Sequence, residues 1–446
     1  MKIRYAALFA AVLCMILLLN GCSLSVKPPD MLMAPPKLTG GFQDLQDEFE
    51  KVIGSDVTFI TPVNGEHTSA FIVEDMNSDG REDAIVFYSP KEGDETAIFS
   101  VFNKNEDDEW NFIKTVKGAG NSVDTVIIED INNDKIKEVV VGWNLFTSKK
   151  QFTVYEPDNR SAEDYFRACG SSPYDLITTA DLNGDENNEL FFTLFDTTAS
   201  VPEASASLAV IENSKMKILD KIVLDSNISG YSAVYRDTVD GQTVIYADAL
   251  KNEHDMITEI ILWDTKSSKL VDPVINSQNH TNTATWRNSR ISVQDFDKDG
   301  HLEIPAGLEI PGSSVVVAGA LQDETLCFTC WSSFNGTKLK AEKYMIYNDN
   351  EGYSLDIPSS WIGKISVTSL DSQLYFYRWN SGSREHMGNQ LFSIVSHTTE
   401  AQSITGYQSI IEYDGRSFEY NITKDGESFG VTDQQIKEGF SLKDNS

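Results

Sequence analysis

Acidic residues at fixed spacing recur along this chain, and they are of the types that bind hard cations. The pattern Asp-x-Asn/Asp-x-Asp, closed by an acid four residues later, occurs four times. Calcium prefers oxygen ligands, so alternate side chains of a short, sharply turned loop can surround it. Positions 1, 3, 5 and 9 offer side-chain oxygens, and position 7 offers its backbone carbonyl. In that order of positions (1, 3, 5, 7, 9), the sets are Asp75, Asn77, Asp79, Arg81, Asp83; Asp130, Asn132, Asp134, Ile136, Glu138; Asp181, Asn183, Asp185, Asn187, Glu189; and Asp295, Asp297, Asp299, His301, Glu303.

The sixth position of each loop favours glycine, because the bend there tends to need a positive φ. Gly80 and Gly300 meet this demand, whereas Lys135 and Glu186 do not. We therefore expect up to four structural Ca²⁺ sites, with the second and third loops more strained or weaker. His301 stands where the backbone carbonyl is the ligand, so its ring is expected to face solvent.

The loops recur at a nearly even period and lie between short apolar segments. A fifth, eroded copy without metal ligands begins at Asp237. Segments of strand character precede the copies and follow them, and a third and a fourth segment complete several of the units. Four strands in a unit of about 55 residues, repeated along the chain, are typical of propeller blades. The expected strands are residues 70–73, 125–128, 176–179, 233–235 and 291–293 before the loops, and 84–88, 139–141, 190–192, 244–246 and 304–306 after them.

Two of these stretches carry a family resemblance. Residues 73–85 (VEDMNSDGREDAI) and 294–304 (QDFDKDGHLEI) resemble the FG-GAP/VCBS repeat of the calcium-binding blades in integrin α-chains. The whole chain resembles VCBS-repeat lipoproteins of Gram-positive bacteria, whose small C-terminal domain opens with a motif that reads YSLDIPSSW at residues 353–361 here. The resemblance implies a propeller and calcium, and it carries no assigned biochemical activity.

These features predict a mainly β fold: a β-propeller of about 5–7 four-stranded blades, five of them recognisable as repeats, followed by a small α+β domain. The expected division is a propeller over 41–347 and a C-terminal domain over 348–446. Residues 56–60 are expected to supply a closing strand, unless a sixth blade is hidden. Near the C-terminus, Thr432 and Gln435 have the spacing of a capping box and predict a short closing helix.

The amino terminus has the layout of a lipoprotein export signal. Lys2 and Arg4 precede an uncharged apolar run over residues 5–19, and Leu19-Asn20-Gly21-Cys22 reads as a lipobox. The run is short for a membrane span. We expect a signal peptide over 1–21, lipidation of Cys22 and a Pro-rich tether over 22–40, and hence an extracytoplasmic protein anchored to the cell membrane by lipid. The alternative is an ordinary secretory signal with an incidental cysteine.

The net charge of the chain limits the classes of partner that it can bind. Lys and Arg number 36 against 68 Asp and Glu, for a net charge of −32. Such a charge argues against nucleic acid and against an anionic membrane surface. The acidic loops supply part of it, and a generally acidic surface is the alternative source.

Catalytic and redox signals are weak in this sequence. The six histidines have no metal-binding spacing, and no nucleophile or nucleotide motif is present. Cys327 and Cys330 form a C-x-x-C inside an apolar run, where core packing is expected and a redox role or pairing with Cys169 is the alternative. Seven tryptophans allow sugar stacking, with Trp143 and Trp286 the least clearly buried.

The leading functional prediction is therefore a binding scaffold for a protein or a glycan, with no catalytic residue assigned. The alternative is a polysaccharide-acting hydrolase or lyase that uses the propeller channel. A purely structural role in the envelope is a third possibility that sequence does not separate from the first.

Overall fold

The computed structural model describes residues 42–91, 95–157, 166–198, 200–382 and 386–443. The expected signal peptide, Cys22 and the whole of the tether lie outside these residues. Within the described ranges, no helix combines the length and apolar character needed to span a membrane.

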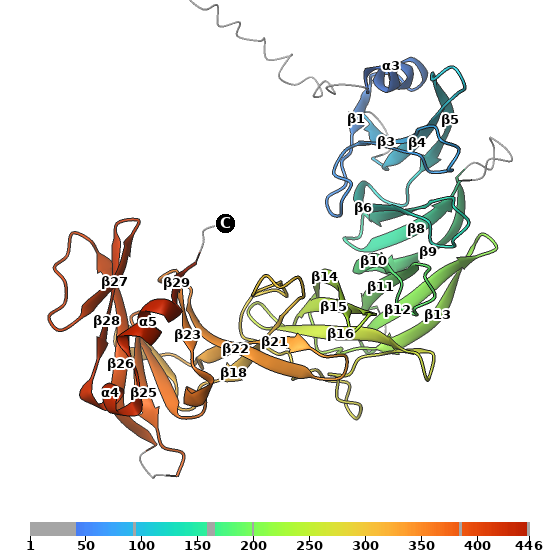
Figure 1. The fold of residues 1–446 in the computed structure, drawn as a ribbon. Coiled ribbons are helices and arrows are strands. Elements are labelled where there is room, and N and C mark those ends of the chain that lie inside the picture. The colour runs from blue at the N-terminus through green and yellow to red at the C-terminus, as the bar shows by residue number, and fades with distance from the viewer. Residues whose placement is uncertain (1–41, 92–94, 158–165, 199, 383–385, 444–446) are drawn as a thin grey trace, which may run out of the picture.

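The protein is mainly β, and most of it is a series of antiparallel sheets that follow one another along an arc (Figure 1). Three of the sheets are four-stranded, and in each of them the strands are in chain order. They are β6 (Ser122–Glu129), β7 (Glu138–Asn144), β8 (Lys150–Glu156) and β9 (Arg167–Tyr174); β10 (Leu176–Ala180), β11 (Glu189–Asp196), β12 (Glu203–Glu212) and β13 (Lys215–Val223); and β14 (Gly230–Val239), β15 (Gln242–Leu250), β16 (Met256–Asp264) and β17 (Lys269–Val271).

The first sheet has five strands because two short strands pair along the same edge of its third strand. β1 (Val57–Phe59) and β2 (Phe71–Glu74) pair with successive halves of β3 (Asp83–Pro90), which is followed by β4 (Ile98–Lys104) and β5 (Trp110–Lys117). Part of the expected segment 56–60 therefore contributes a strand, but it extends the first sheet and closes no ring among the described strands. Helix α3 (Gln43–Val52), which sequence reasoning missed, buries Leu45 and Phe49 against this sheet.

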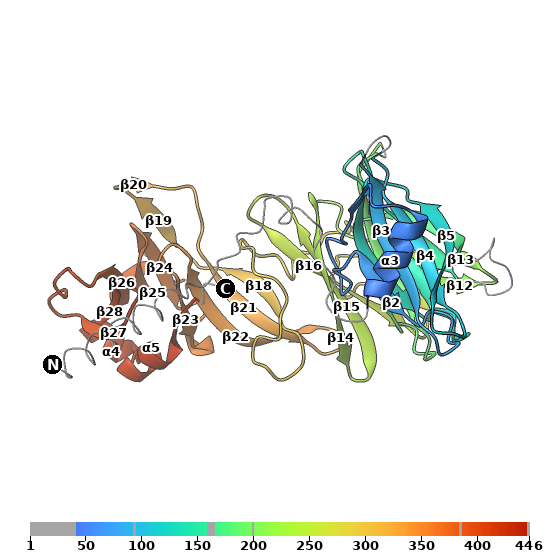
Figure 2. The same cartoon turned by 90° about the horizontal axis from the view of Figure 1, so that it is seen from above.

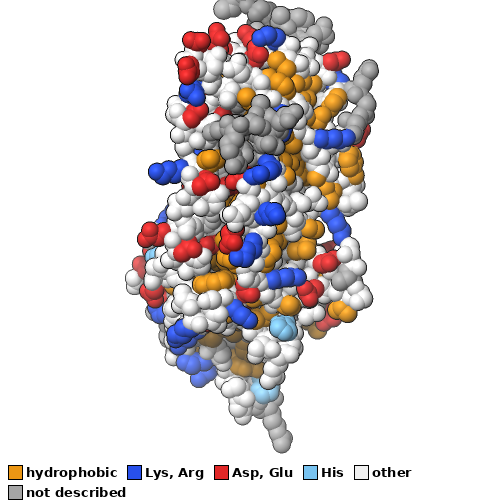
Figure 3. All heavy atoms as spheres, turned by 90° about the vertical axis from the view of Figure 1, so that its right-hand side faces the viewer, with side chains coloured by type: hydrophobic (Ala, Val, Ile, Leu, Met, Phe, Trp, Pro, Cys, Tyr) orange, Lys and Arg blue, Asp and Glu red, His pale blue; other side chains and the backbone are white. Residues whose placement is uncertain are grey.

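The first strands of the sheets share one side of the arc. β6, β10 and β14 lie on its inner side, and β5, β9 and β13 lie on its outer side (Figure 1). Seen from the outer side, hydrophobic side chains run between Lys/Arg and Asp/Glu side chains (Figure 3). Ile218 and Val223 of β13 are among the exposed hydrophobic residues. The described strands form no closed ring, so the expected number of blades is not confirmed.

Neighbouring sheets pack face to face through shared hydrophobic cores. Trp143 of β7 is fully buried and stacks on Phe99 of β4, with ring centroids 6.1 Å apart. This contact removes Trp143 as a sugar platform. Ile245 of β15 belongs to one core with Phe191 of β11, which joins the third and fourth sheets in the same way.

Residues 291–293 do not form the expected first strand of the fifth repeat. Their backbone groups form hydrogen bonds with side chains instead of with a neighbouring strand. Arg287 Nε donates to the Ile291 carbonyl at 2.6 Å, and the Val293 N–H donates to Asp248 Oδ2 at 3.2 Å. Only an isolated bridge between Gln294 and Glu303 marks the expected hairpin. The strand after the loop does form, as β18 (Ile304–Glu309).

The fifth sheet runs across the expected domain boundary at residue 348. β18, β21 (Cys327–Phe334) and β22 (Leu339–Asn348) continue into β23 (Tyr353–Ile357) and then β29 (Phe440–Leu442). A hairpin of β19 (Ser314–Val317) and β20 (Ala320–Leu321) leaves this sheet, and β19 pairs in parallel with β24 (Ile365–Leu370) (Figure 2).

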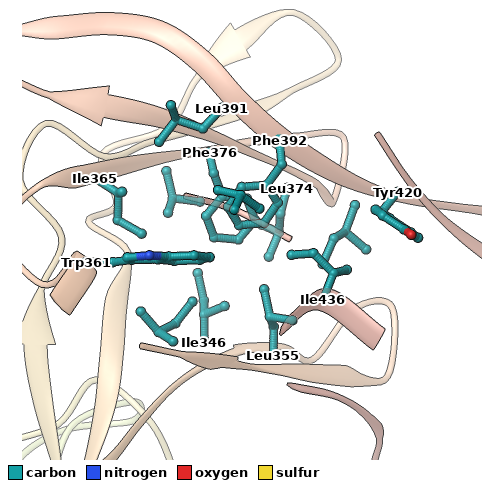
Figure 4. Packing of buried hydrophobic residues seen from close by; sticks show 14 of the residues in the cluster. Ile346, Leu355, Trp361, Ile365, Leu374, Phe376, Leu391, Phe392, Tyr420 and Ile436 are labelled. Atoms are coloured by element: carbon teal, nitrogen blue, oxygen red, sulfur yellow. The ribbon is translucent and has the colours of Figure 1, made fainter. Parts of the chain in front are cut away.

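β24 belongs to a seven-stranded sheet in the order β20-β19-β24-β25-β26-β28-β27. Its remaining strands are β25 (Gln373–Trp379), β26 (Met387–Thr398), β27 (Gln408–Tyr413) and β28 (Arg416–Ile422). The two sheets share one core, in which Ile346 and Leu355 face Trp361, Phe376 and Phe392 (Figure 4).

Short helices complete this region. α5 (Asp433–Gly439) has the predicted capping box, in which the side chains of Thr432 and Gln435 bond each other's backbone. η1 (Ser359–Trp361) and α4 (Lys424–Phe429), with N-cap Thr423, were not predicted because each is shorter than two turns.

Candidate metal loops

The first three Asp-rich loops lie where the repeat predicts them, in the hairpins β2–β3, β6–β7 and β10–β11. The fourth lies immediately before β18. The eroded copy is different: β14 and β15 meet in a tight turn at Asp240 and Gly241, with φ of 50° and 80°. A two-residue turn leaves no room for ligand positions.

The four loops share one hydrogen-bond pattern. The carboxylate at position 1 accepts the N–H of position 6 at 2.8–3.1 Å. Side chains at positions 3 and 5 accept the N–H groups two residues on, at 2.8–3.1 Å. The acid at position 9 reaches back to the N–H of position 2 at 2.8–3.0 Å. Four separate segments therefore fold into the same loop, with side-chain oxygens turned toward its centre.

The loop backbone is left-handed at two positions. The sixth residues Gly80, Lys135, Glu186 and Gly300 have φ between 70° and 93°, as the sequence predicted. The fourth residues Ser78, Asn133, Gly184 and Lys298 also have positive φ, between 56° and 79°. Sequence reasoning missed the fourth position, where only one copy carries glycine. Side chains other than glycine are strained in this region, so Lys135 and Glu186 hold a conformation that costs free energy.

The acids converge in three of the four loops. Carboxylate oxygens lie within 4.8 Å of one another in the groups Asp181–Asp185–Glu189, Asp295–Asp297–Asp299 and Asp134–Glu138–Glu156. The last group includes Glu156 of β8, which no loop pattern indicates; only the pairing of β7 with β8 brings it to the loop. In the first loop, Asp79 Oδ2 instead accepts from the Arg81 guanidinium at 2.8 Å.

The ninth-position acids are the buried acids of these loops. Glu138 and Glu189 are fully buried, and Glu303 is 3% exposed. Burial raises the pKa of Glu138 to about 8 and that of Glu189 to about 7, helped by neighbouring carboxylates of the same loops. Burial also raises the pKa of Glu303. A divalent cation would act against both causes, because it stabilises the ionised carboxylates around it.

The donor set suits a hard cation. It consists of carboxylate, amide and backbone oxygens, which are the ligands calcium prefers. Asp75 Oδ1, at the first ligand position, is buried and accepts no hydrogen bond from the described residues, and the same holds for the side-chain oxygen of Asn187 beside the expected carbonyl ligand. A buried oxygen without a donor is unfavourable, and metal coordination is one way to satisfy it. The residues present therefore fit Ca²⁺.

Contacts between successive loops also connect neighbouring sheets. The Met76 carbonyl accepts the Lys137 N–H at 2.7 Å, and Lys137 Nζ forms an ion pair with Glu74. In the next pair of sheets, Asn188 and Thr179 both donate to Glu129. In each case the residue just before one loop contacts the residue before the last acid of the next. The loops therefore link the sheets to one another as well as closing their own hairpins.

The other candidates from sequence do not gather into a site. The His301 side chain is 60% exposed, and its Nδ1 lies 3.3 Å from Asp237 Oδ1. Cys169, Cys327 and Cys330 are free thiols, and burial raises the pKa of Cys327 to about 11. Among the described residues, neither the histidines nor the cysteines form a metal-binding group.

Comparisons with known proteins identify no relative by sequence. No family profile matches the chain, and no curated protein does so either. Solved structures that match include the rhamnogalacturonan lyase PL11 of Bacillus licheniformis, with 10% identity over 82% of this chain and 74% of the lyase, at a TM-score of 0.31. Sqt1 from Chaetomium thermophilum matches with 10% identity over 70% of this chain and 68% of Sqt1, at a TM-score of 0.29. A hypothetical protein from Leishmania major matches with 10% identity over 64% of this chain and 90% of that one, at a TM-score of 0.24. At these TM-scores the likenesses support no conclusion about fold or function.

Proposed function

We propose that this protein is a lipid-anchored, extracytoplasmic binding scaffold in which calcium stiffens a propeller-like array of VCBS/FG-GAP blades. The observation that carries the proposal is the common geometry of the four loops, with the same hydrogen bonds at the same positions. Loops that differ in sequence at positions 4, 6 and 7 keep the same hydrogen bonds, and the acids converge in three of them, which favours a shared ligand over four independent turns.

The ions would act on stability. Each would offset the repulsion among three or four acids of its loop and hold the loop that links its sheet to the next. Side-chain oxygens at positions 1, 3, 5 and 9 and the carbonyl at position 7 would hold the ion, with Glu156 added in the second loop. A stiff array of sheets then presents a broad surface, which suits the binding of a protein or a glycan.

Thermal unfolding of the full-length chain in detergent, with chelator and with millimolar calcium, tests the calcium sites. One site filled at 100 times its dissociation constant adds about 2.7 kcal/mol, so several sites should raise the midpoint by many degrees. Asp185→Asn should shrink the increase, because it removes a charge from the third loop. Asp240→Asn, in the turn that lost its loop, is the matched control and should keep the full increase. An equal midpoint with chelator and with calcium would refute the calcium sites.

The membrane anchor needs its own test. Cells that express the chain and receive a labelled fatty acid should incorporate the label, and Cys22→Ser should abolish incorporation. Cys169→Ser is the control and should retain it. A chain that fractionates with membranes without label would contradict lipidation at Cys22.

A further inference from the structure

A hollow of about 570 Å³ lies on the inner side of the arc, against the first strands of three consecutive sheets. Its walls come from β6, β10 and β14, together with residues 65–67 of the segment that precedes β2. Cavities of roughly 300–1,000 Å³ are typical of small-ligand sites. The volume is therefore enough for a ligand of one or two sugar rings.

The segment at residues 63–65 is fixed onto the second sheet by its backbone. The Val63 N–H donates to the Asp124 carbonyl at 3.0 Å, and the Asn64 N–H donates to it at 2.7 Å. Gly65 follows with φ +87°, and a Cβ there would lie 2.5 Å from Thr125 Oγ1. A side chain at this position would clash with Thr125, which favours glycine. The segment thus passes from the first sheet to β6 and places His67 at the rim of the hollow.

Basic side chains gather around the hollow although the chain as a whole is strongly acidic. His67, Lys137 and Arg236 come from three different parts of the chain and line the same space. Arg236 Nη1 donates to the Thr179 carbonyl at 2.6 Å, which fixes the guanidinium at the wall. Its Nε and Nη2 have no acceptor among the described residues, so this fixed fork is available to a ligand.

The acids on the same walls are largely occupied by protein donors. Glu129 accepts from Thr179 and Asn188. Asp130 accepts the backbone N–H groups of Asp134 and Lys135 at 3.2 and 2.8 Å. Glu66 is exposed at the end of the segment. Lys137 is paired with Glu74, so among the described residues of these walls Arg236 is the cation without an acidic partner, with His67 beside the same space.

We propose that this hollow binds an anionic saccharide, with Arg236 holding its carboxylate or phosphate and His67 donating a further hydrogen bond. Guanidinium pairs with both anions in a fork geometry. Thr178 and the free parts of the edge strands β6 and β10 would supply partners for sugar hydroxyls. A saccharide with few charges fits better than a dense polyanion such as nucleic acid, because the net charge of −32 repels the latter. This inference rests on the proposed binding function and assigns it a ligand class.

Calorimetric titration of the full-length chain in detergent with millimolar calcium tests the inference. The probes are short oligogalacturonate, which carries carboxylates, short poly(glycerol phosphate), which carries phosphates, and a neutral maltooligosaccharide of matched length. We expect binding of a charged probe and none of the neutral one, and the two charged probes distinguish the source of the anion. Arg236→Gln should weaken binding about 10- to 100-fold, because it removes a charged hydrogen bond. His67→Gln should weaken it less.

Arg378→Gln is the matched control, since Arg378 is an exposed arginine of β25 far from the hollow. It should bind as the unaltered chain does, and all variants should unfold at the same temperature. Equal binding by Arg236→Gln, or tighter binding of a single-stranded oligonucleotide than of either charged saccharide, would overturn the inference. A thermal unfolding midpoint that depends on calcium, without saccharide binding, would refute the saccharide site but not the calcium sites. Saccharide binding that survives chelator, without any calcium shift, would refute the calcium sites alone.

Discussion

The Leu302 N–H donates to Asp237 Oδ2 at 3.0 Å. The acid that remains in the eroded copy therefore supports the metal loop that begins at Asp295. Asp237 stands where the first ligand of a metal loop would be, and Leu302 precedes the last acid of the next loop. The fourth sheet has lost its loop, yet it still contacts the residue before the last acid of the next loop, here through the position-1 acid where the first two junctions use the residue before the loop.

Asp237→Ala should destabilise the protein by about 1–2 kcal/mol, because it leaves the Leu302 N–H without its acceptor. Urea unfolding with chelator present measures the change without any contribution from bound calcium. Asp107→Ala removes an acid from an exposed turn and should change the free energy of unfolding little. Equal effects of the two substitutions would show that the contact contributes nothing.

Glycine at the sixth position of the second and third loops should stabilise them. Lys135→Gly and Glu186→Gly relieve side chains held at φ 72° and 70°, for an expected gain of up to about 1 kcal/mol each. Ile136→Gly, at a neighbouring position whose φ is not positive, should instead destabilise the chain. Chemical unfolding with and without calcium would separate backbone strain from ion binding, since relief of strain appears in both conditions.

The buried ion pair between Arg287 and Asp248 predicts strongly non-additive substitutions. The two groups meet at 2.9 Å with side chains 1% and 0% exposed. Arg287→Met should cost about 3–5 kcal/mol, because it leaves the Asp248 charge buried and unpaired. The double variant with Asp248→Asn should recover part of this loss. Lys217→Met, in a pair whose side chains are 57% and 51% exposed, should change stability by less than about 0.5 kcal/mol.

Glu259 and Asp272 should make stability depend on pH. Burial raises both pKa values above the ordinary 4.5 and 3.8, and the two carboxyl groups share a hydrogen bond. The folded state therefore holds protons that the unfolded chain releases. This contribution to stability is complete at low pH and is lost as pH rises through 4.5 toward the raised pKa values.

Urea unfolding from about pH 4 to about pH 8 measures this effect. The unaltered chain should lose stability relative to Glu259→Gln as pH rises, because the variant has no proton to release at residue 259. Glu342→Gln, an exposed acid beside Lys340, is the control and should not reproduce this trend. Parallel curves for Glu259→Gln and the unaltered chain would contradict the prediction.

The cysteines should react slowly with alkylating reagents, and reductant should not change the unfolding midpoint. Cys327 and Cys330 pair with Glu309 and Ala306 along β21, so alternate faces of the strand carry them and no bridge forms. With the pKa of Cys327 raised to about 11 by burial, alkylation at neutral pH should be slow until the chain unfolds. Mass spectrometry after iodoacetamide treatment should find Cys327 unmodified in the folded protein. A midpoint that falls with reductant would show a disulfide instead.

The sequence by itself determined the features that are local. The loop hydrogen bonds join residues at most seven positions apart, so residue type and spacing suffice to predict them, including the positive φ at Lys135 and Glu186. The capping box of Thr432 and Gln435 and the alternation of β21 are local in the same sense.

Tertiary structure decided what depends on partners far along the chain. Glu156 reaches the second loop only because β8 pairs with β7, and residues 291–293 fail to form a strand because Arg287 and Asp248 take their backbone groups. The fifth sheet continues past residue 348 because β23 pairs with β22. The sheets together follow an open arc. His67, Lys137 and Arg236 share one hollow for the same reason: the energies that place them are packing energies between sheets, which no single repeat contains.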